Sequence, residues 1–190
     1  MSRLAPLAVE AMSAEQRRVH DSILARPRGK VGGPFPALLR SPTLADRVQE
    51  LGAALRFESS LAPDVRELAI LCVARHTGSA VEWNAHVAIA LRKGVPESAI
   101  AAVLHGHDLS DLPASQCAGI AFCRELCASQ NISDAVYLSA LEQFGETGLV
   151  ELTTITGYFT LLAMILNAFD VPPEDRDGIP PDALRLPELG

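Results

Sequence analysis

Residues 66–86, RELAILCVARHTGSAVEWNAH, contain the pattern that decides the fold of this chain. No helix-breaking residue interrupts 66–75, and Pro63 just upstream suits a first helical turn. Thr-Gly at 77–78 indicates a short break. A second helix is expected over about 79–93, with a glycine following it as a stop signal. The segment therefore predicts two consecutive helices joined by a tight connection.

Three ionisable residues lie on the apolar faces of these helices. Glu67 belongs to the apolar stripe of the first helix, and His86 to that of the second. Glu82 stands one turn before His86, at the spacing that allows a hydrogen bond along one helix face. Because helices joined by so short a break pack antiparallel or steeply crossed, we expect Glu67 to reach the region of His86. Ionisable groups in such places either take part in a reaction or form a buried ion pair between the helices. Spacing alone is compatible with both interpretations.

The remaining pattern is helical throughout, which predicts an all-α protein with a single domain over 1–190. No segment shows a convincing strand period. Residues 1–40 are expected to form an N-terminal helix and loop, with a capping box at Ser13 and Gln16, and 171–190 an extended tail. The other predicted helices are 41–56, 96–106, 113–128, 133–144 and 148–169.

Charge and hydropathy narrow the class of protein. A formal net charge of −7, with no Lys/Arg cluster, argues against a nucleic-acid partner. The N-terminus lacks the apolar run of a signal peptide, so a cytoplasmic location is expected. The most apolar segment, 149–169, contains Glu151, four threonines and an asparagine. It is too polar for a membrane span, which predicts a buried helix or a homo-oligomer interface.

The segment 66–86 resembles the core of the carboxymuconolactone decarboxylase/alkylhydroperoxidase D-like superfamily. Its peroxidase branch carries a Glu, then Cys-x-x-Cys, then a His four residues later. On this chain the Glu and His fall on Glu67 and His86, while the two thiol positions hold Ser79 and Glu82. The Glu-Trp-x-x-His form at 82–86 is similar to the non-thiol branch. Segments 33–42, 51–57 and 157–172 extend the resemblance over nearly the whole chain.

The resemblance implies a compact helical bundle, commonly a trimer or hexamer with sites near subunit interfaces. It also implies a cofactor-free enzyme acting by general acid–base chemistry on a small organic acid or lactone, as in decarboxylation. His86 is the candidate proton carrier, with Glu67 and Glu82 as its catalytic partners. Substrate-binding candidates are Trp83, Ser79 and Tyr158, although a core role for Tyr158 fits its position equally well.

Two other functional classes stay open. The first is a thiol peroxidase, which the other branch of the superfamily performs; the residues at 79 and 82 argue against it, because two thiols are needed. The second is a non-catalytic binding protein in which Glu67 and His86 are structural. Arg66 or Arg75 is a candidate for holding a substrate carboxylate, or a solvated helix residue.

The cysteines and the remaining histidines can be explained by structural roles. Cys72, Cys117, Cys123 and Cys127 form no Cys-x-x-Cys motif and are interpreted as small apolar core residues. His105 and His107 precede two aspartates in a way that a metal site could use. A solvated helix end explains them as well, and no metal or cofactor is predicted. His76 is expected near the C-terminal cap of its helix.

Overall fold

The computed structural model describes residues 2–27, 29–173 and 180–187, and within them the protein is all-α, without a β-strand. The main helices are α1 (Ala14–Ala25), α3 (Pro42–Ala53), α4 (Pro63–Thr77), α5 (Ala80–Arg92), α6 (Glu97–His105), α7 (Ala114–Ser129) and α8 (Asp134–Ala168). Short elements complete the fold: η1 (Val9–Ala11), α2 (Phe35–Leu38), η2 (Ala54–Glu58) and η3 (Asp182–Leu184). The predicted fold class is confirmed.

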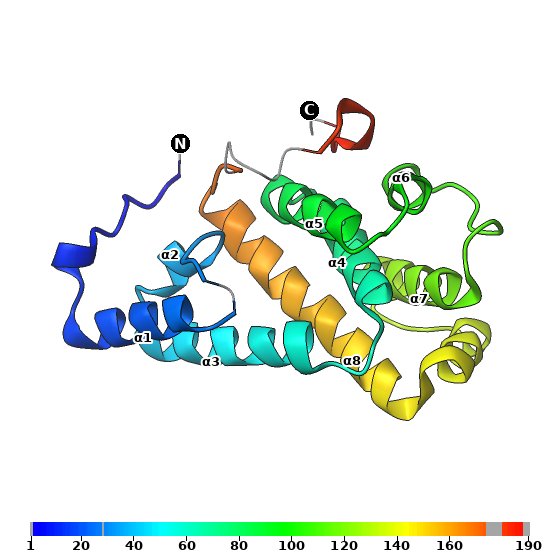
Figure 1. Ribbon diagram of the computed structural model, residues 1–190, viewed down its shortest axis with the longest axis horizontal. Coiled ribbons are helices and arrows are strands. Elements are labelled where there is room, and N and C mark those ends of the chain that lie inside the picture. Colours follow the sequence, from blue (N-terminus) through cyan, green and yellow to red (C-terminus); the bar gives the residue numbers. More distant parts are fainter. Residues whose placement is uncertain (1, 28, 174–179, 188–190) are drawn as a thin grey trace.

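Helix α4 lies at the centre of the bundle and packs against α5, α6, α7 and α8. Figure 1 shows α8 running diagonally across the molecule, with α1 and α3 on one side and α4 to α7 on the other. Nearly every residue of α4 from Val65 to Ala74 is buried. A helix that is apolar on all sides is stable only when every face is buried. The central position of α4 provides this burial.

The connection between α4 and α5 has the expected form. Pro63 occupies the first turn of α4, and Gly78 ends the helix in the left-handed conformation with φ 65°. Its N–H donates to the carbonyl of Ala74, which satisfies one of the last orphan acceptors of α4. Helix α5 begins two residues later, so the chain reverses within a few residues and the two helices pack against each other.

Two details of the longer predicted helices differ from the sequence-based expectation. The helix predicted over 41–56 is α3 followed by the π-helical turn η2, which widens the end of the helix before Ser59. The last two predicted helices form one element, α8, bent at Gly145, whose φ of 63° and ψ of −179° only glycine adopts readily. The bend falls between the predicted segments.

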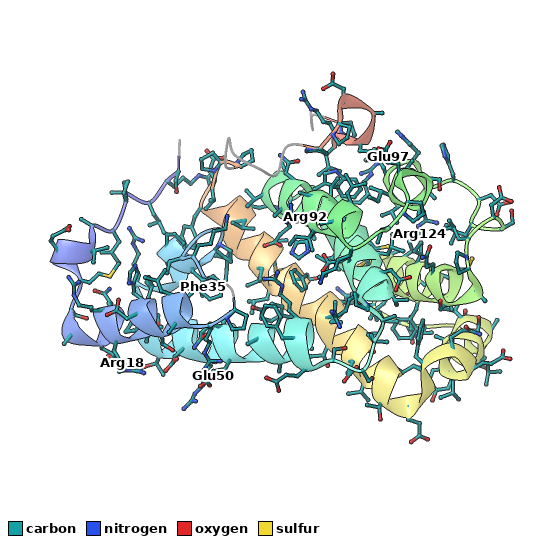
Figure 2. The ribbon with its side chains drawn as sticks, in the orientation of Figure 1. Arg18, Phe35, Glu50, Arg92, Glu97 and Arg124 are labelled. Carbon is teal, nitrogen blue, oxygen red and sulfur yellow. The ribbon has the colours of Figure 1, made fainter. Side chains whose placement is uncertain are left out.

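A second, smaller apolar cluster joins the N-terminal helices to the bundle. Val19 and Ile23 of α1 meet Phe35 of α2 and Ala45 of α3. Figure 2 marks Phe35 between these helices. The loop expected within 1–40 thus contains a short helix, because Pro34 and Pro36 favour a helical turn there. The capping box of Ser13 and Gln16 is confirmed at the start of α1.

Helix α8 is long and apolar enough to cross a membrane by length and composition, but half of its most apolar window is buried inside the protein. A core helix has the same character, and here Leu152, Ile155 and Leu162 are buried in the main apolar cluster.

Candidate active site

The centre of the candidate site is a direct contact between α4 and α5. Nδ1 of His86 lies 2.7 Å from Oε2 of Glu67, and both side chains are 6 % exposed. The predicted meeting of these residues across the two helices is therefore confirmed. Their catalytic roles stay predictions.

Glu82 completes a row of three ionisable side chains. Its Oε2 lies 3.5 Å from Nε2 of His86, one helical turn away on α5, and its side chain is 8 % exposed. The imidazole thus stands between two carboxylates, one at each ring nitrogen. Phe159 of α8 contacts the imidazole edge to face, with ring centroids 5.1 Å apart. This aromatic wall was missed by sequence reasoning, because nothing in its local pattern distinguishes Phe159 from other apolar residues of α8.

The ionisation of Glu67 follows from its surroundings. Burial raises the pKa of this carboxyl, but the hydrogen bond from His86 lowers it. The charges of His86, Arg56 and Arg66 lower the pKa further, and the balance lies below the ordinary value. Glu67 is therefore a carboxylate at neutral pH, which can only accept a hydrogen bond. Nδ1 of His86 must then carry the proton in this contact, and Nε2 is the nitrogen left to exchange protons.

Ser79 lies at the beginning of the same helix. It is the N-cap residue of α5 and is 1 % exposed. Its hydroxyl makes no hydrogen bond with any described residue. A buried hydroxyl without a partner is costly, and a substrate atom or a water molecule would remove that cost. The substrate-binding role of Ser79 stays a prediction.

Trp83 and Tyr158 each hold distant segments of the chain together. The indole Nε1 of Trp83 donates to the carbonyl of Leu184 at 2.7 Å, and the side chain is fully buried. The hydroxyl of Tyr158 donates to the carbonyl of Val48 in α3 at 3.0 Å. Both contacts give these residues structural partners, and their predicted roles toward substrate stay untested.

The two arginines proposed for carboxylate binding lie in different places. Arg66 donates to the carbonyl of Leu61 just before α4 and lies near enough to Glu67 to lower its pKa. Arg75 lies two turns along and donates to the carbonyl of Leu104 at 2.8 Å. Arg75 lines a separate cavity with His76, which is exposed in the last turn of α4.

Three of the four cysteines, Cys72, Cys123 and Cys127, are poorly suited to redox catalysis. Burial raises the pKa of Cys72 well above its ordinary value, that of Cys123 to about 12 and that of Cys127 to about 11. Reactive cysteines need the opposite shift. Among the described residues, no group of three or more His, Cys, Asp or Glu is arranged to hold a metal ion. His105 and His107 stack with ring centroids 5.1 Å apart.

Comparison with known proteins agrees with this geometry. Residues 42–121 match the model of the carboxymuconolactone decarboxylase family, a stretch that contains Glu67, Glu82 and His86. In both the matched stretch and the fold, the chain is similar to the carboxymuconolactone decarboxylase/alkylhydroperoxidase D-like superfamily. No curated protein matches the chain.

Two solved structures have a fold similar to that of this chain. The first is described as an alkylhydroperoxidase AhpD core, an uncharacterised peroxidase-related protein from Ralstonia eutropha JMP134. It is 21% identical, with a TM-score of 0.76, and the match covers 92% of this chain and 93% of the other. The second is an uncharacterised peroxidase-related protein from Silicibacter sp. TM1040. It is 15% identical, with a TM-score of 0.76, and the match covers 92% of each chain.

Proposed function

We propose that this superfamily member is a cofactor-free enzyme that moves protons at Nε2 of His86 in a reaction of a small organic acid or lactone. One observation carries the proposal: a buried imidazole stands between two carboxylates, with Glu67 at Nδ1 and Glu82 near Nε2. A single carboxylate would be enough for a structural pair. The second carboxylate, near the nitrogen that exchanges protons, is what a proton relay needs.

Decarboxylation is the reaction for which His86, placed between Glu67 and Glu82, would be best suited. Loss of carbon dioxide from a carboxylated unsaturated lactone leaves the electron pair of the broken C–C bond in the conjugated carbonyl. Nε2 of His86 then donates a proton to the ring carbon, which restores a neutral product. In this proposal Glu82, 3.5 Å from Nε2, returns a proton to His86 after each turnover, while Glu67 holds the imidazole in the required tautomer.

A homo-oligomer, as a trimer or hexamer, belongs to the same proposal. Val150, Leu161 and Met164 on one side of α8 are exposed by 66%, 43% and 62%. Large apolar side chains gathered along one helix face are typical of a subunit interface. A small-molecule substrate and a cytoplasmic location remain predictions from the sequence, as does the absence of nucleic-acid and membrane partners.

A thiol peroxidase is the second candidate, favoured by the descriptions of the two structural neighbours as peroxidase-related. Against it stand Ser79 and Glu82, where the peroxidase pattern requires thiols. The raised pKa values of Cys72, Cys123 and Cys127 also leave these thiols protonated at neutral pH.

Product analysis separates the two candidates. Wild-type protein is incubated with a panel of carboxylated lactones, and released carbon dioxide is measured; in parallel, an organic hydroperoxide is supplied with a dithiol donor. The proposal expects carbon dioxide from at least one lactone and no hydroperoxide turnover. Hydroperoxide turnover that disappears when all four cysteines are replaced by serine would establish the peroxidase instead.

A further inference from the structure

A cavity of about 270 Å³ lies away from the Glu67–His86 contact, among α4, α6 and α7. Its lining comes from three helices: Cys72, Arg75 and His76 from α4, Val103 from α6, and Arg124 and Cys127 from α7. Neither Glu67, Glu82 nor His86 borders it. The volume is close to the lower end of the range for small-molecule sites.

The charge of this cavity is uncompensated. Arg75 and Arg124 are half-buried, and no acidic residue is among the lining residues. In the described part of the chain, neither guanidinium lies within ion-pair distance of a carboxylate. Two half-buried positive charges side by side in a cavity repel each other, and an anion between them removes that cost.

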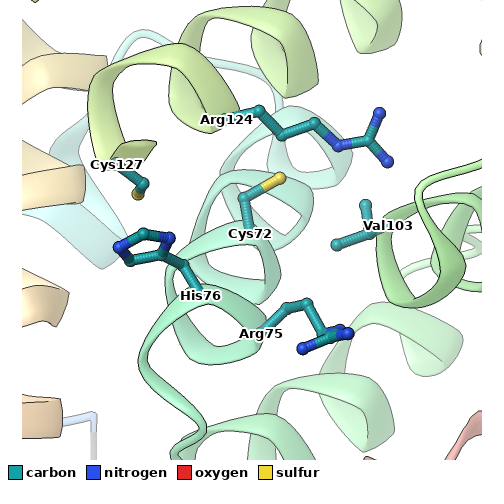
Figure 3. Close-up of a pocket in the computed structure, with 6 residues that line it drawn as sticks. All are labelled: Cys72, Arg75, His76, Val103, Arg124 and Cys127. Atoms are coloured by element: carbon teal, nitrogen blue, oxygen red, sulfur yellow. The ribbon is translucent and has the colours of Figure 1, made fainter. Parts of the chain in front are cut away.

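Each guanidinium is held in place by one backbone carbonyl near the end of α6. Arg75 donates from Nε to Leu104 at 2.8 Å, and Arg124 donates from Nη2 to Ala102 at 2.6 Å. A guanidinium has five N–H donors, so each retains several for a ligand. Figure 3 shows both head groups on the same side of the cavity, with Val103 between them. The two positive groups are thus fixed in position before a ligand arrives.

Val103 and two cysteines give the cavity a neutral side beside the two arginines. The side chain of Val103 is a hydrocarbon, and burial keeps the thiols of Cys72 and Cys127 protonated at neutral pH by raising their pKa values. His76 stands exposed at the rim, opposite the guanidinium groups in Figure 3. An inorganic anion would use only the charged side of such a cavity. A short organic anion would use both sides.

We propose that this cavity is a second ligand site, which binds a short dicarboxylate with one carboxylate on Arg75, the other on Arg124, and its methylene carbons against Val103. The site is independent of the proposed acid–base centre, because the two share no residue. The competing explanation is that both arginines only cap the C-terminal end of α6, where positive charge is favourable.

Binding of succinate measured by isothermal titration calorimetry tests the proposal, with neutral succinamide and inorganic phosphate as comparison ligands. Succinate is expected to bind wild-type protein more tightly than either. Arg124→Gln should weaken it by about tenfold or more, because a charge-assisted hydrogen bond is lost. Arg92→Gln is the same change at an exposed arginine of α5 that does not line the cavity, labelled in Figure 2, and it should leave binding unchanged.

Two further measurements keep the proposal testable if Arg124→Gln unfolds. Cys127→Leu narrows the cavity but keeps both arginines, and it should also weaken succinate binding about tenfold. Succinate should slow alkylation of Cys127 in the wild-type protein. The assignment is overturned if succinate does not bind the wild-type protein, or if it binds Cys127→Leu as tightly as the wild type. It is also overturned if phosphate binds as tightly as succinate, or if succinate does not slow the alkylation of Cys127.

Discussion

The Nδ1 atom of His86 lies 2.7 Å from Oε2 of Glu67, and this contact joins the two central helices of the bundle at a buried point. Because Glu67 is ionised there, the contact fixes which ring nitrogen carries a proton. The other nitrogen faces Glu82 at 3.5 Å. The same three side chains therefore stabilise the packing of α4 against α5 and define a direction for proton transfer.

Replacing Glu67 with glutamine should change how stability depends on pH. The pKa of Glu67 in the folded protein lies below its ordinary value of 4.5. Such a carboxyl stabilises the fold above that value, and the stabilisation is lost as pH falls through the folded-state pKa. Urea unfolding from neutral to acidic pH should show wild type and Glu67→Gln converging at low pH. At neutral pH the variant should be less stable by about 1–3 kcal/mol. A difference that stays constant over the whole range would contradict this account.

The indole of Trp83 should report on the C-terminal tail, because its N–H donates to Leu184 and the chain has a single tryptophan. Trp83→Phe leaves the carbonyl of Leu184 without this donor and should cost about 1–3 kcal/mol in unfolding free energy. Deleting residues 180–190 from the otherwise unchanged protein should shift tryptophan fluorescence to longer wavelength. Identical emission spectra for the two lengths would show that the tail does not cover Trp83.

The exposed face of α8 should hold the subunits together. Met164→Glu places a charge on this apolar face and should dissociate the oligomer in light scattering, whereas Leu138→Glu should leave it intact. Leu138 is the matched control, since it lies beyond the bend of α8 at Gly145 and its exposure of 60% is close to the 62% of Met164. A wild-type protein that scatters as a 20.2 kDa monomer contradicts the prediction, and so does equal dissociation by both changes.

Local sequence was sufficient to predict most of the long helices and the contact between Glu67 and His86. A proline at the start of α4 and a glycine at its end fix the bounds of that helix, and the short connection restricts how α5 can pack. The bend of α8 at Gly145 likewise follows from local chemistry, since a glycine stands between two apolar runs. These features depend on residues close together in the chain.

The sequence pattern could not predict the contacts between segments that lie far apart in the chain. The hydrogen bond from Trp83 to Leu184 spans 101 residues, and that from Tyr158 to Val48 spans 110. The cavity beside Arg75 requires α4, α6 and α7 to meet, and neither Arg124 nor its neighbours have a motif that marks them. Spacing along one helix reveals which residues share a face, but it does not reveal which other helix covers that face.

The central claim is that Nε2 of His86 supplies the proton to the reacting carbon. The most direct measurement is the rate of deuterium incorporation into the product in deuterium oxide, for a lactone that releases carbon dioxide with the wild-type protein. His86→Gln should lower this rate by about 100-fold or more while the thermal unfolding transition remains cooperative. An unchanged rate of incorporation in a folded His86→Gln protein would contradict the account and leave the Glu67–His86 pair as a structural contact.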